Sequence, residues 1–526
     1  MHKVNVLALI LALIIAVPAA MAQSSSCTSI TPSNNTFTAA LVGNGISGSP
    51  NGFGGVNFSL SGTQATVSAR SLGLGNNITA ITLFQGTPGS TTAVPVQTFS
   101  TSANGFSNGQ FTGTMTLDQN LINQIQANPG NFFFVINTSQ FPNGAVAGSL
   151  VPLRPQLLAG RISGTNVQGG SNAGSGAFVF SIGPNNGTGT VPLNFDIATF
   201  ALGDGFNSLS LIPTGGGAPL VILGTNTTAN NGHIVGSTMI SNALAQQLLA
   251  NPCSFTLSLT TPTFPNGAVA GALSAANEVF IPVAGSASGA NGTHFQTDLN
   301  IFNNSTIGVT DQSATSQAFA EFFPTGGTNT ASSVTAQSVN ILDIPARGTT
   351  LLRDVSSSLF SGQVSGIGAL RIISAGNIFA NARIYDNQIA AGRGTSGQSE
   401  PGMFRSQALQ QGVLVGVGIE NIPSGINLPS YRTNVGFFNP NDTATTIAVE
   451  LRDSNGVVMS SRLITLGAWA QTQMPLTGTN GLFPALDQNF ATASVYFLSG
   501  MPIFGYASIV DNVSGDASFV IPSSNP

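Results

Sequence analysis

The chain has 526 residues, of which 42% are hydrophobic and 6% are charged, and its formal net charge is −5. Disorder usually combines low hydrophobicity with high charge, so this composition excludes a disordered chain. One lysine, Lys3, and scattered arginines provide no clustered positive surface, which excludes nucleic-acid binding and a polybasic membrane contact. So few titratable groups also predict a stability that is nearly flat between about pH 4 and 9.

Residues 1–22 have the pattern of a secretion signal. Lys3 supplies positive charge, an apolar run over 6–17 follows, and Ala20-Met21-Ala22 is a small-residue cleavage site. The run is short for the roughly 20 residues that a membrane span needs, which disfavours an anchor. We expect export through a Sec-type signal to the medium or the cell surface, no membrane insertion after signal removal, and a polar leader at 23–35.

Cys27 and Cys253 are the cysteines of the chain. In an exported protein they can form a disulfide, which here would close a loop of more than two hundred residues. The alternative is two separate thiols, one of them buried in a strand. The sequence leaves both alternatives open.

An unchanged octapeptide marks a duplication in the first half. Phe-Pro-Asn-Gly-Ala-Val-Ala-Gly occurs at 141–148 and again at 264–271, 123 residues later. Self-similarity at a fixed offset is the signature of repeated modules. Asn-Gly accepts the positive φ angles of a type I′ turn, so we expect a two-residue β-hairpin in each copy. The predicted modules are 36–153 and 157–275.

Both modules are predicted to be β-sandwiches that contain one short helix. Runs such as 54–60 and 65–72 alternate with period two, and turn residues separate them. Asp118 is a candidate helix N-cap, and Ser241 takes its place in the second copy. Asn-Pro ends the helix in both copies, at 128–129 and 251–252.

The end of each module resembles the CHRD (chordin) domain of secreted bacterial proteins. The shared features are a helix ending in Asn-Pro, a strand with a threonine, and the motif Phe-Pro-Asn-Gly-Ala-Val-x-Gly-x-Leu. The resemblance implies a Greek-key-like β-sandwich in an extracellular protein without established catalytic activity. Many bacterial members carry a histidine where this chain has Asn137 and Thr260, and an arginine where it has Ala147 and Ala270. A ligand role tied to those histidines is therefore not expected here.

The composition changes after residue 275. Residues 23–275 hold three acids and three arginines, whereas 276–526 hold fifteen and nine. Segment 295–303 is similar to 431–439, and 378–387 is similar to 503–512, which indicates a second duplication. We predict β-sandwich modules at 277–395 and 411–523, joined by a linker at 396–410. They resemble uncharacterised tandem modules of secreted bacterial proteins, and the whole chain is predicted to be all-β with four tandem sandwiches.

Residues able to carry chemistry are few. After the signal, His233 and His294 are the only histidines and fall in different modules, so we expect each to be a lone surface or loop residue. Asp298, Asp386 and Asp511 are weak candidate metal ligands, because calcium prefers carboxylates. The competing interpretation is that these acids accept backbone hydrogen bonds in turns and at strand ends. No catalytic residue and no cofactor are assigned.

We therefore expect an exported, non-enzymatic protein with a binding, adhesion or structural role at the cell surface or in the extracellular matrix. Its partner would be an unknown extracellular protein or polysaccharide. One alternative is a calcium-binding or hydrolytic protein that uses the acids of the C-terminal half. Another is a glycan-binding protein that uses Trp469, because aromatic rings with a polar edge stack on sugars.

Overall fold

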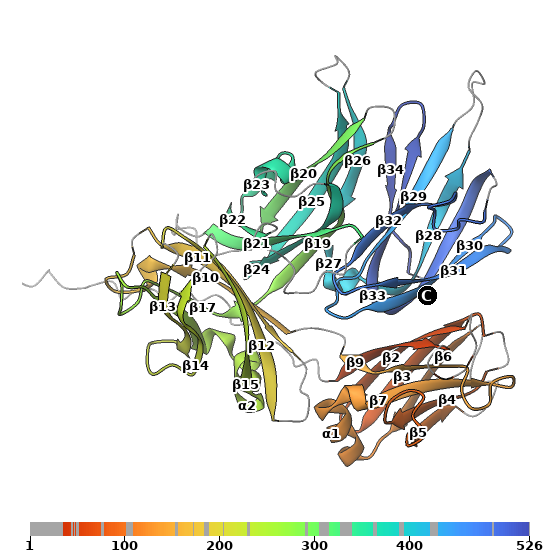
Figure 1. Ribbon diagram of the computed structural model, residues 1–526, viewed down its shortest axis with the longest axis horizontal. Coiled ribbons are helices and arrows are strands. Elements are labelled where there is room, and N and C mark those ends of the chain that lie inside the picture. Colours follow the sequence, from red (N-terminus) through yellow and green to blue (C-terminus); the bar gives the residue numbers. More distant parts are fainter. Residues whose placement is uncertain are drawn as a thin grey trace, which may run out of the picture.

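The computed structural model describes residues 35–524 with gaps at 44–45, 47, 49–51, 75–77, 101–108, 153–155, 172, 184–188, 203–204, 229–231, 290–292, 305–314, 327–338, 361–365, 389–393, 421–429 and 487–488. The predicted signal, most of the leader and Cys27 lie outside the described residues. Antiparallel sheets dominate the described part, which confirms the all-β prediction (Figure 1).

Module 1 is one curved nine-stranded sheet, ordered β5-β4-β7-β8-β1-β2-β3-β6, with β9 beside β1. Strand β1 pairs with β2 on one side and with β8 and β9 on the other, so the sheet is continuous and wraps around its own core. Its elements are β1 (Thr36–Val42), β2 (Phe53–Ser61), β3 (Gln64–Leu72), β4 (Ile78–Gln85), β5 (Val94–Ser100), β6 (Gln110–Thr116), α1 (Gln119–Ala127), β7 (Phe132–Thr138), β8 (Val146–Ser149) and β9 (Val151–Pro152).

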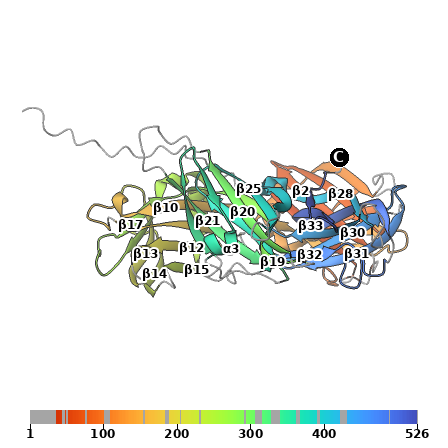
Figure 2. The ribbon, with the colours of Figure 1, turned by 90° about the horizontal axis from the view of Figure 1, so that it is seen from above.

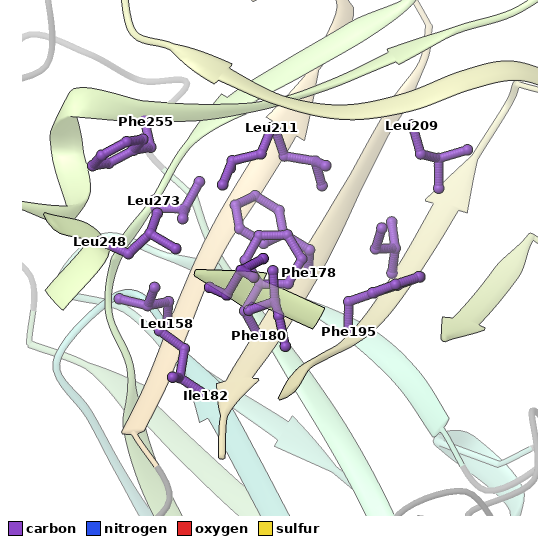
Figure 3. Close-up of a cluster of buried hydrophobic side chains, with 14 of the residues drawn as sticks. Leu158, Phe178, Phe180, Ile182, Phe195, Leu209, Leu211, Leu248, Phe255 and Leu273 are labelled. Carbon is purple, nitrogen blue, oxygen red and sulfur yellow. The ribbon is translucent and has the colours of Figure 1, made fainter. Parts of the chain in front are cut away.

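Module 2 repeats this topology strand for strand, as the duplicated sequence predicts. The order is β14-β13-β16-β17-β10-β11-β12-β15, with β18 beside β10. Phenylalanine and aliphatic side chains fill the space that the sheet encloses (Figure 3). Its elements are β10 (Gln156–Ser163), β11 (Ser175–Ile182), β12 (Thr190–Phe200), β13 (Gly205–Pro213), β14 (Val221–Thr228), β15 (His233–Ser241), α2 (Asn242–Ala250), β16 (Phe255–Thr260), β17 (Val269–Ala272) and β18 (Ser274–Ala275).

The two helices begin where the cap residues predict. The Asp118 carboxylate accepts a hydrogen bond from the Asn120 backbone N at 2.8 Å, and the Ser241 hydroxyl accepts one from the Leu244 backbone N at 3.2 Å. Each bond satisfies a backbone donor that the first turn of a helix leaves unpaired. Cap chemistry is thus preserved between the copies although the residue differs.

The octapeptide forms a different turn from the predicted type I′ hairpin. The Gly144 N–H donates to the Phe141 carbonyl at 3.1 Å, with Pro142 and Asn143 between them, and Asn143 does not have a positive φ. These features define a type I turn, in which Pro at the second position is favoured. It lies inside a seven-residue connection between β7 and β8, so the two-residue hairpin prediction was wrong.

The last glycine of the octapeptide is required by close packing. A Cβ on Gly148 would lie 1.8 Å from the carbonyl oxygen of Ala40, and one on Gly271 would lie 1.8 Å from that of Arg161. Strands β8 and β17 therefore approach β1 and β10 at a distance that only glycine permits. Backbone geometry therefore explains why this glycine is the same in both copies.

Modules 3 and 4 share a second topology, in which two layers enclose one core. Module 3 contains β19 (Asn277–Ser288), β20 (His294–Asn303), β21 (Thr315–Pro324), β22 (Val339–Pro345), β23 (Thr349–Leu352), α3 (Val355–Ser358), β24 (Gly366–Ser374), β25 (Ile378–Asn387), β26 (Thr395–Pro401) and β27 (Met403–Phe404). Module 4 contains β28 (Leu409–Ile419), β29 (Tyr431–Phe438), β30 (Thr445–Arg452), β31 (Val458–Leu466), β32 (Gln471–Pro475), β33 (Phe490–Asp511) and β34 (Ala517–Val520).

Strand pairing supports the second duplication. In module 4 the long β33 pairs with β28 and β30 through its first half and with β29 and β34 through its second half. In module 3, β24 pairs with β19 and β21, whereas β25 pairs with β20 and β26. Strands β24 and β25 together thus occupy the place of β33, and β25 carries the sequence repeat 378–387.

The predicted linker at 396–410 is not a linker. Strand β26 pairs with β25 along its whole length, and β27 pairs with β19. Module 3 therefore extends to Phe404, and only the short segment 405–408 separates it from β28. The glycine and serine residues suggested a flexible segment, but here they occupy a strand.

The modules pack in the order 2–3–4–1, which differs from their order along the chain. Modules 3 and 4 lie side by side above modules 2 and 1 (Figures 1 and 2). Separate apolar clusters join the pairs. Leu157, Ala159, Ala177 and Val179 of module 2 meet Phe319 and Ile373 of module 3, and Phe53 of module 1 meets Ala448 and Leu498 of module 4. Phe280, Phe323, Ala369 and Met403 of module 3 meet Phe438, Ala468, Trp469 and Phe504 of module 4.

Candidate functional site at the module junction

Asp298 of β20 is buried and its carboxylate is used within module 3. It accepts hydrogen bonds from the Asp354 backbone N at 2.9 Å, from the Tyr385 hydroxyl at 3.1 Å and from the Arg353 guanidinium at 3.4 Å. These donors tie β20 to β25 and to the start of α3. Burial raises the pKa of Tyr385, and the hydrogen bond to Asp298 and the charge of Asp298 raise it further.

Asp386 and Asp511 lie at equivalent strand ends, but they do not meet Asp298. Asp386 accepts from the His294 backbone N at 2.8 Å and from the Gln388 side chain. Asp511 accepts from the backbone N of Val513 at 2.6 Å and of Ser514 at 3.1 Å. The Asp511 bonds to the backbone two and three residues on are typical of an Asx turn, whereas Asp386 bonds to the neighbouring strand β20. Across the described residues, no group of three or more His, Cys, Asp or Glu side chains could hold a metal ion.

His233 is a buried interface residue, and the prediction of a lone surface or loop position for it was wrong. Its exposed fraction is 8%, and its Nε2 contacts the carboxylate of Asp196 on the neighbouring strand β12. The His233 ring also lies 6.3 Å, centroid to centroid, from Phe319 of module 3. His294 is exposed as predicted, with Nε2 3.0 Å from the Ser286 hydroxyl.

A buried network of charged residues in module 3 lies next to the His233–Asp196 pair. Arg371 of β24 contacts Glu278 of β19 at 2.6 Å and Glu321 of β21 at 3.0 Å. Arg405, which precedes β28, contacts the other oxygen of Glu278 at 2.5 Å and donates to the Pro440 carbonyl of module 4 at 2.6 Å. We call these four residues, with Asp196, His233 and Trp469, the module junction.

The acids of the module junction divide into two electrostatic classes. Burial alone would raise the pKa of Glu278, but the two arginines Arg405 and Arg371 outweigh it and lower that pKa to about 2. Burial raises the pKa of Glu321 despite its contact with Arg371, and burial also raises the pKa of Asp196 despite its contact with His233. Glu278 is therefore the firmly ionised partner of both arginines.

Trp469 completes the module junction from module 4. Its exposed fraction is 4%, its ring stacks on Phe323 with centroids 5.3 Å apart, and the Arg371 and Arg405 guanidinium carbons lie 4.5 and 5.6 Å from its ring centroid. A ring enclosed in this way cannot stack on a sugar. The glycan-binding interpretation based on Trp469 is therefore not supported by its position.

The module junction can hold three modules together, since removal of one partner from a buried ion pair costs about 3–5 kcal/mol. The sequence contained all seven residues but no sign that they meet, because they come from strands far apart in the chain. The arginine-to-acid pairing on adjacent strands, Arg371 opposite Glu321, becomes visible only once the strand register is known.

Cys253 is disulfide-bonded. It lies in the 3-10 turn Pro252–Ser254 that follows α2, where its carbonyl accepts a hydrogen bond from the Thr214 hydroxyl at 2.7 Å. Cys27, the other cysteine of the sequence, lies outside the described residues.

Comparisons with known proteins do not place the chain in a family. No family model matches the chain, and no curated protein matches it. One similar solved structure is the crystal structure of Thermotoga maritima 1070, with 9% sequence identity and a TM-score of 0.19, over 23% of this chain and 97% of that one. Among the described residues, no helix is long and apolar enough to cross a membrane.

Proposed function

We propose that the protein is an exported, non-enzymatic protein with a structural or adhesive role at the cell surface or in the extracellular matrix, and that it works as one rigid four-module block. The secretion-signal pattern supports export. The kinship of modules 1 and 2 with CHRD domains, which we propose from their shared motif, is consistent with an extracellular setting.

The observation that carries this proposal is the use made of the scarce charged and aromatic side chains. In a chain with 6% charged residues, Glu278, Glu321, Arg371 and Arg405 lie in one buried network against the single tryptophan. Side chains of these types could serve catalysis or ligand binding if they faced solvent. Here they join modules, as a structural or surface-presenting block requires.

The nearly neutral composition indicates which kind of partner the block would bind. Scattered serine, threonine and asparagine residues leave no strong field to steer a charged ligand, which favours contacts that depend on shape and hydrogen bonding. Such contacts suit a cell-wall polysaccharide or a neutral protein surface as the partner.

The test is binding of the signal-free chain to the envelope fraction of its own host, immobilised and probed by biolayer interferometry. We expect saturable binding that is retained without divalent ions and lost when the modules are separated by substitution at an interface. Calcium-dependent stabilisation that Asp386→Ala abolishes, or hydrolytic turnover that Asp298→Asn abolishes, would instead support the alternative use of the acids.

A further inference from the structure

Glu400 is a fully buried carboxyl group between modules 3 and 4. It lies on β26, its exposed fraction is 0%, and its Oε1 accepts one hydrogen bond, from the Gln398 amide at 3.1 Å. Its Oε2 is buried and has no hydrogen-bond partner. Glu400 is not part of the module junction.

The neighbours of Glu400 connect it to module 4. Gln398 accepts a hydrogen bond from the Ser508 hydroxyl of β33 at 2.8 Å, so the two modules meet across this side chain. Strand β26 runs beside β34, and the Gly397 N–H donates to the Asp516 carboxylate at 3.2 Å. The interface here is polar and is separate from the module junction around Arg371.

Among the residues that the structure describes, no positive group offsets a charge at this position. From β33, Tyr506 is near enough for Glu400 to raise its pKa after burial does, and the Tyr506 hydroxyl accepts from the Gln471 amide at 2.7 Å and donates to the Gln473 side chain at 2.9 Å. The Arg383 guanidinium on β25 donates to the Thr395 hydroxyl at 2.8 Å. Asp516, in the β33–β34 turn, adds negative charge to this interface. An ionised carboxylate enclosed by neutral amides and a phenol is strongly disfavoured.

We propose that Glu400 is a proton-dependent clasp, which keeps modules 3 and 4 closed while its carboxyl group is protonated and loosens their contact when it ionises. Burial raises the pKa of Glu400 well above its ordinary value, in agreement with this geometry. The neutral acid is stable in the buried interface, whereas the carboxylate is more stable when the interface opens and water hydrates it.

The direction of the pH effect follows from linkage. A carboxyl whose pKa is higher in the closed state than in the open state binds its proton more tightly when closed. Closure is therefore strongest below about pH 4.5, the ordinary pKa, and weakens as pH rises towards the raised value. Within that window the ratio of open to closed molecules grows about tenfold for each pH unit.

Hydrogen exchange of the full signal-free chain tests the clasp. Wild type and Glu400→Gln are compared at the same pH, from pH 5 to 9, so that intrinsic exchange rates cancel. For peptides from β26 and β34, we expect the wild-type rate divided by the variant rate to rise about tenfold per pH unit until it levels off. For peptides from β31, which is outside the interface, the ratio should stay near one.

The matched control is Glu420→Gln, which neutralises a half-buried acid at the end of β28. It should exchange like wild type at every pH. If Glu400→Gln does not fold, the wild-type rates of β26, corrected for intrinsic exchange and divided by those of β31, must still rise with pH. A flat profile for wild type, or equal slopes for wild type and Glu400→Gln, would overturn the proposal.

Discussion

The guanidinium carbon of Arg371 in module 3 lies 4.5 Å from the ring centroid of Trp469 in module 4. The Trp469 ring also stacks on Phe323, again from module 3, with the two ring planes 12° apart. The tryptophan is therefore inserted into the neighbouring module. This arrangement makes its truncation a direct test of how much the interface contributes.

Trp469→Ala should lower the free energy of unfolding by about 3–5 kcal/mol, because it removes a large buried ring together with its cation–π contacts. Trp469→Phe, which keeps a smaller ring, should lower it by clearly less. Chemical denaturation monitored by circular dichroism provides the comparison. Unchanged stability of Trp469→Ala together with lost retention on polysaccharide would favour a glycan-binding role instead.

Gly500→Ala should separate module 1 from module 4. A Cβ at this position would lie 2.0 Å from the Ala40 Cβ, and the Gly500 carbonyl lies 2.6 Å from the Thr38 hydroxyl. The backbone around Gly500 and Ala40 cannot move apart to make room for a methyl group without opening the interface between modules 1 and 4. We expect a larger radius of gyration with unchanged far-ultraviolet circular dichroism. Gly205→Ala, where a Cβ meets nothing within 4 Å, is the control and should leave both unchanged.

Glu278→Gln should cost about 3 kcal/mol at pH 7, because it leaves Arg371 and Arg405 buried without their shared anion. The pKa of Glu278 is lowered to about 2, so its contribution is present above the ordinary value near 4.5 and is lost as pH falls from there towards 2. Melting temperatures of wild type and Glu278→Gln should therefore converge in acid. A constant difference between pH 7 and 2.5 would contradict the ion-pair account.

Glu321→Gln should behave in the opposite way, although Glu321 contacts the same arginine. Its pKa is raised, so its carboxylate destabilises the fold as pH rises above about 4.5. We expect this variant to match or exceed wild-type stability at pH 8 and to lose that advantage near pH 4. Thermal melting at both pH values decides the point, and a loss at pH 8 as large as that of Glu278→Gln would refute the distinction.

Gly148→Ala and Gly271→Ala should each unfold their own module, since the new methyl group would overlap a carbonyl oxygen of the neighbouring strand. Asn143→Ala, in the turn of the same octapeptide, should change stability by less than about 0.5 kcal/mol. Limited proteolysis with mass spectrometry would show which module is cut. Equal tolerance of all three substitutions would mean that the repeat is not explained by packing.

Local sequence patterns predicted the local structure well. Asp118 and Ser241 cap the two helices because a cap depends on a few neighbouring residues, and the duplicated segments recur as equivalent strands for the same reason. The type I′ turn was wrongly predicted because Asn-Gly also fits other turns. The turn type at 141–144 depends on Pro142 and on the longer connection from β7 to β8.

The module junction could not be predicted, because it depends on how whole modules pack. His233 is 37 residues from its partner Asp196, and Arg405 is 127 residues from Glu278. The expectation of nearly flat stability between about pH 4 and 9 counted charges without their burial. Because burial raises the pKa values of Asp196, Glu321 and Glu400, we expect stability to decline as pH rises above about 4.5, and melting temperatures across pH 4 to 9 would decide between the two predictions.

Small-angle X-ray scattering of the chain without residues 1–22 tests most directly whether the four modules form one block. The packing order 2–3–4–1 predicts a radius of gyration within a few ångströms of the roughly 24 Å expected for a compact chain of this length. It also predicts a scattering curve that fits the arrangement in Figure 1. A radius of gyration well above about 35 Å, with the profile of separate modules on flexible connections, would contradict the account.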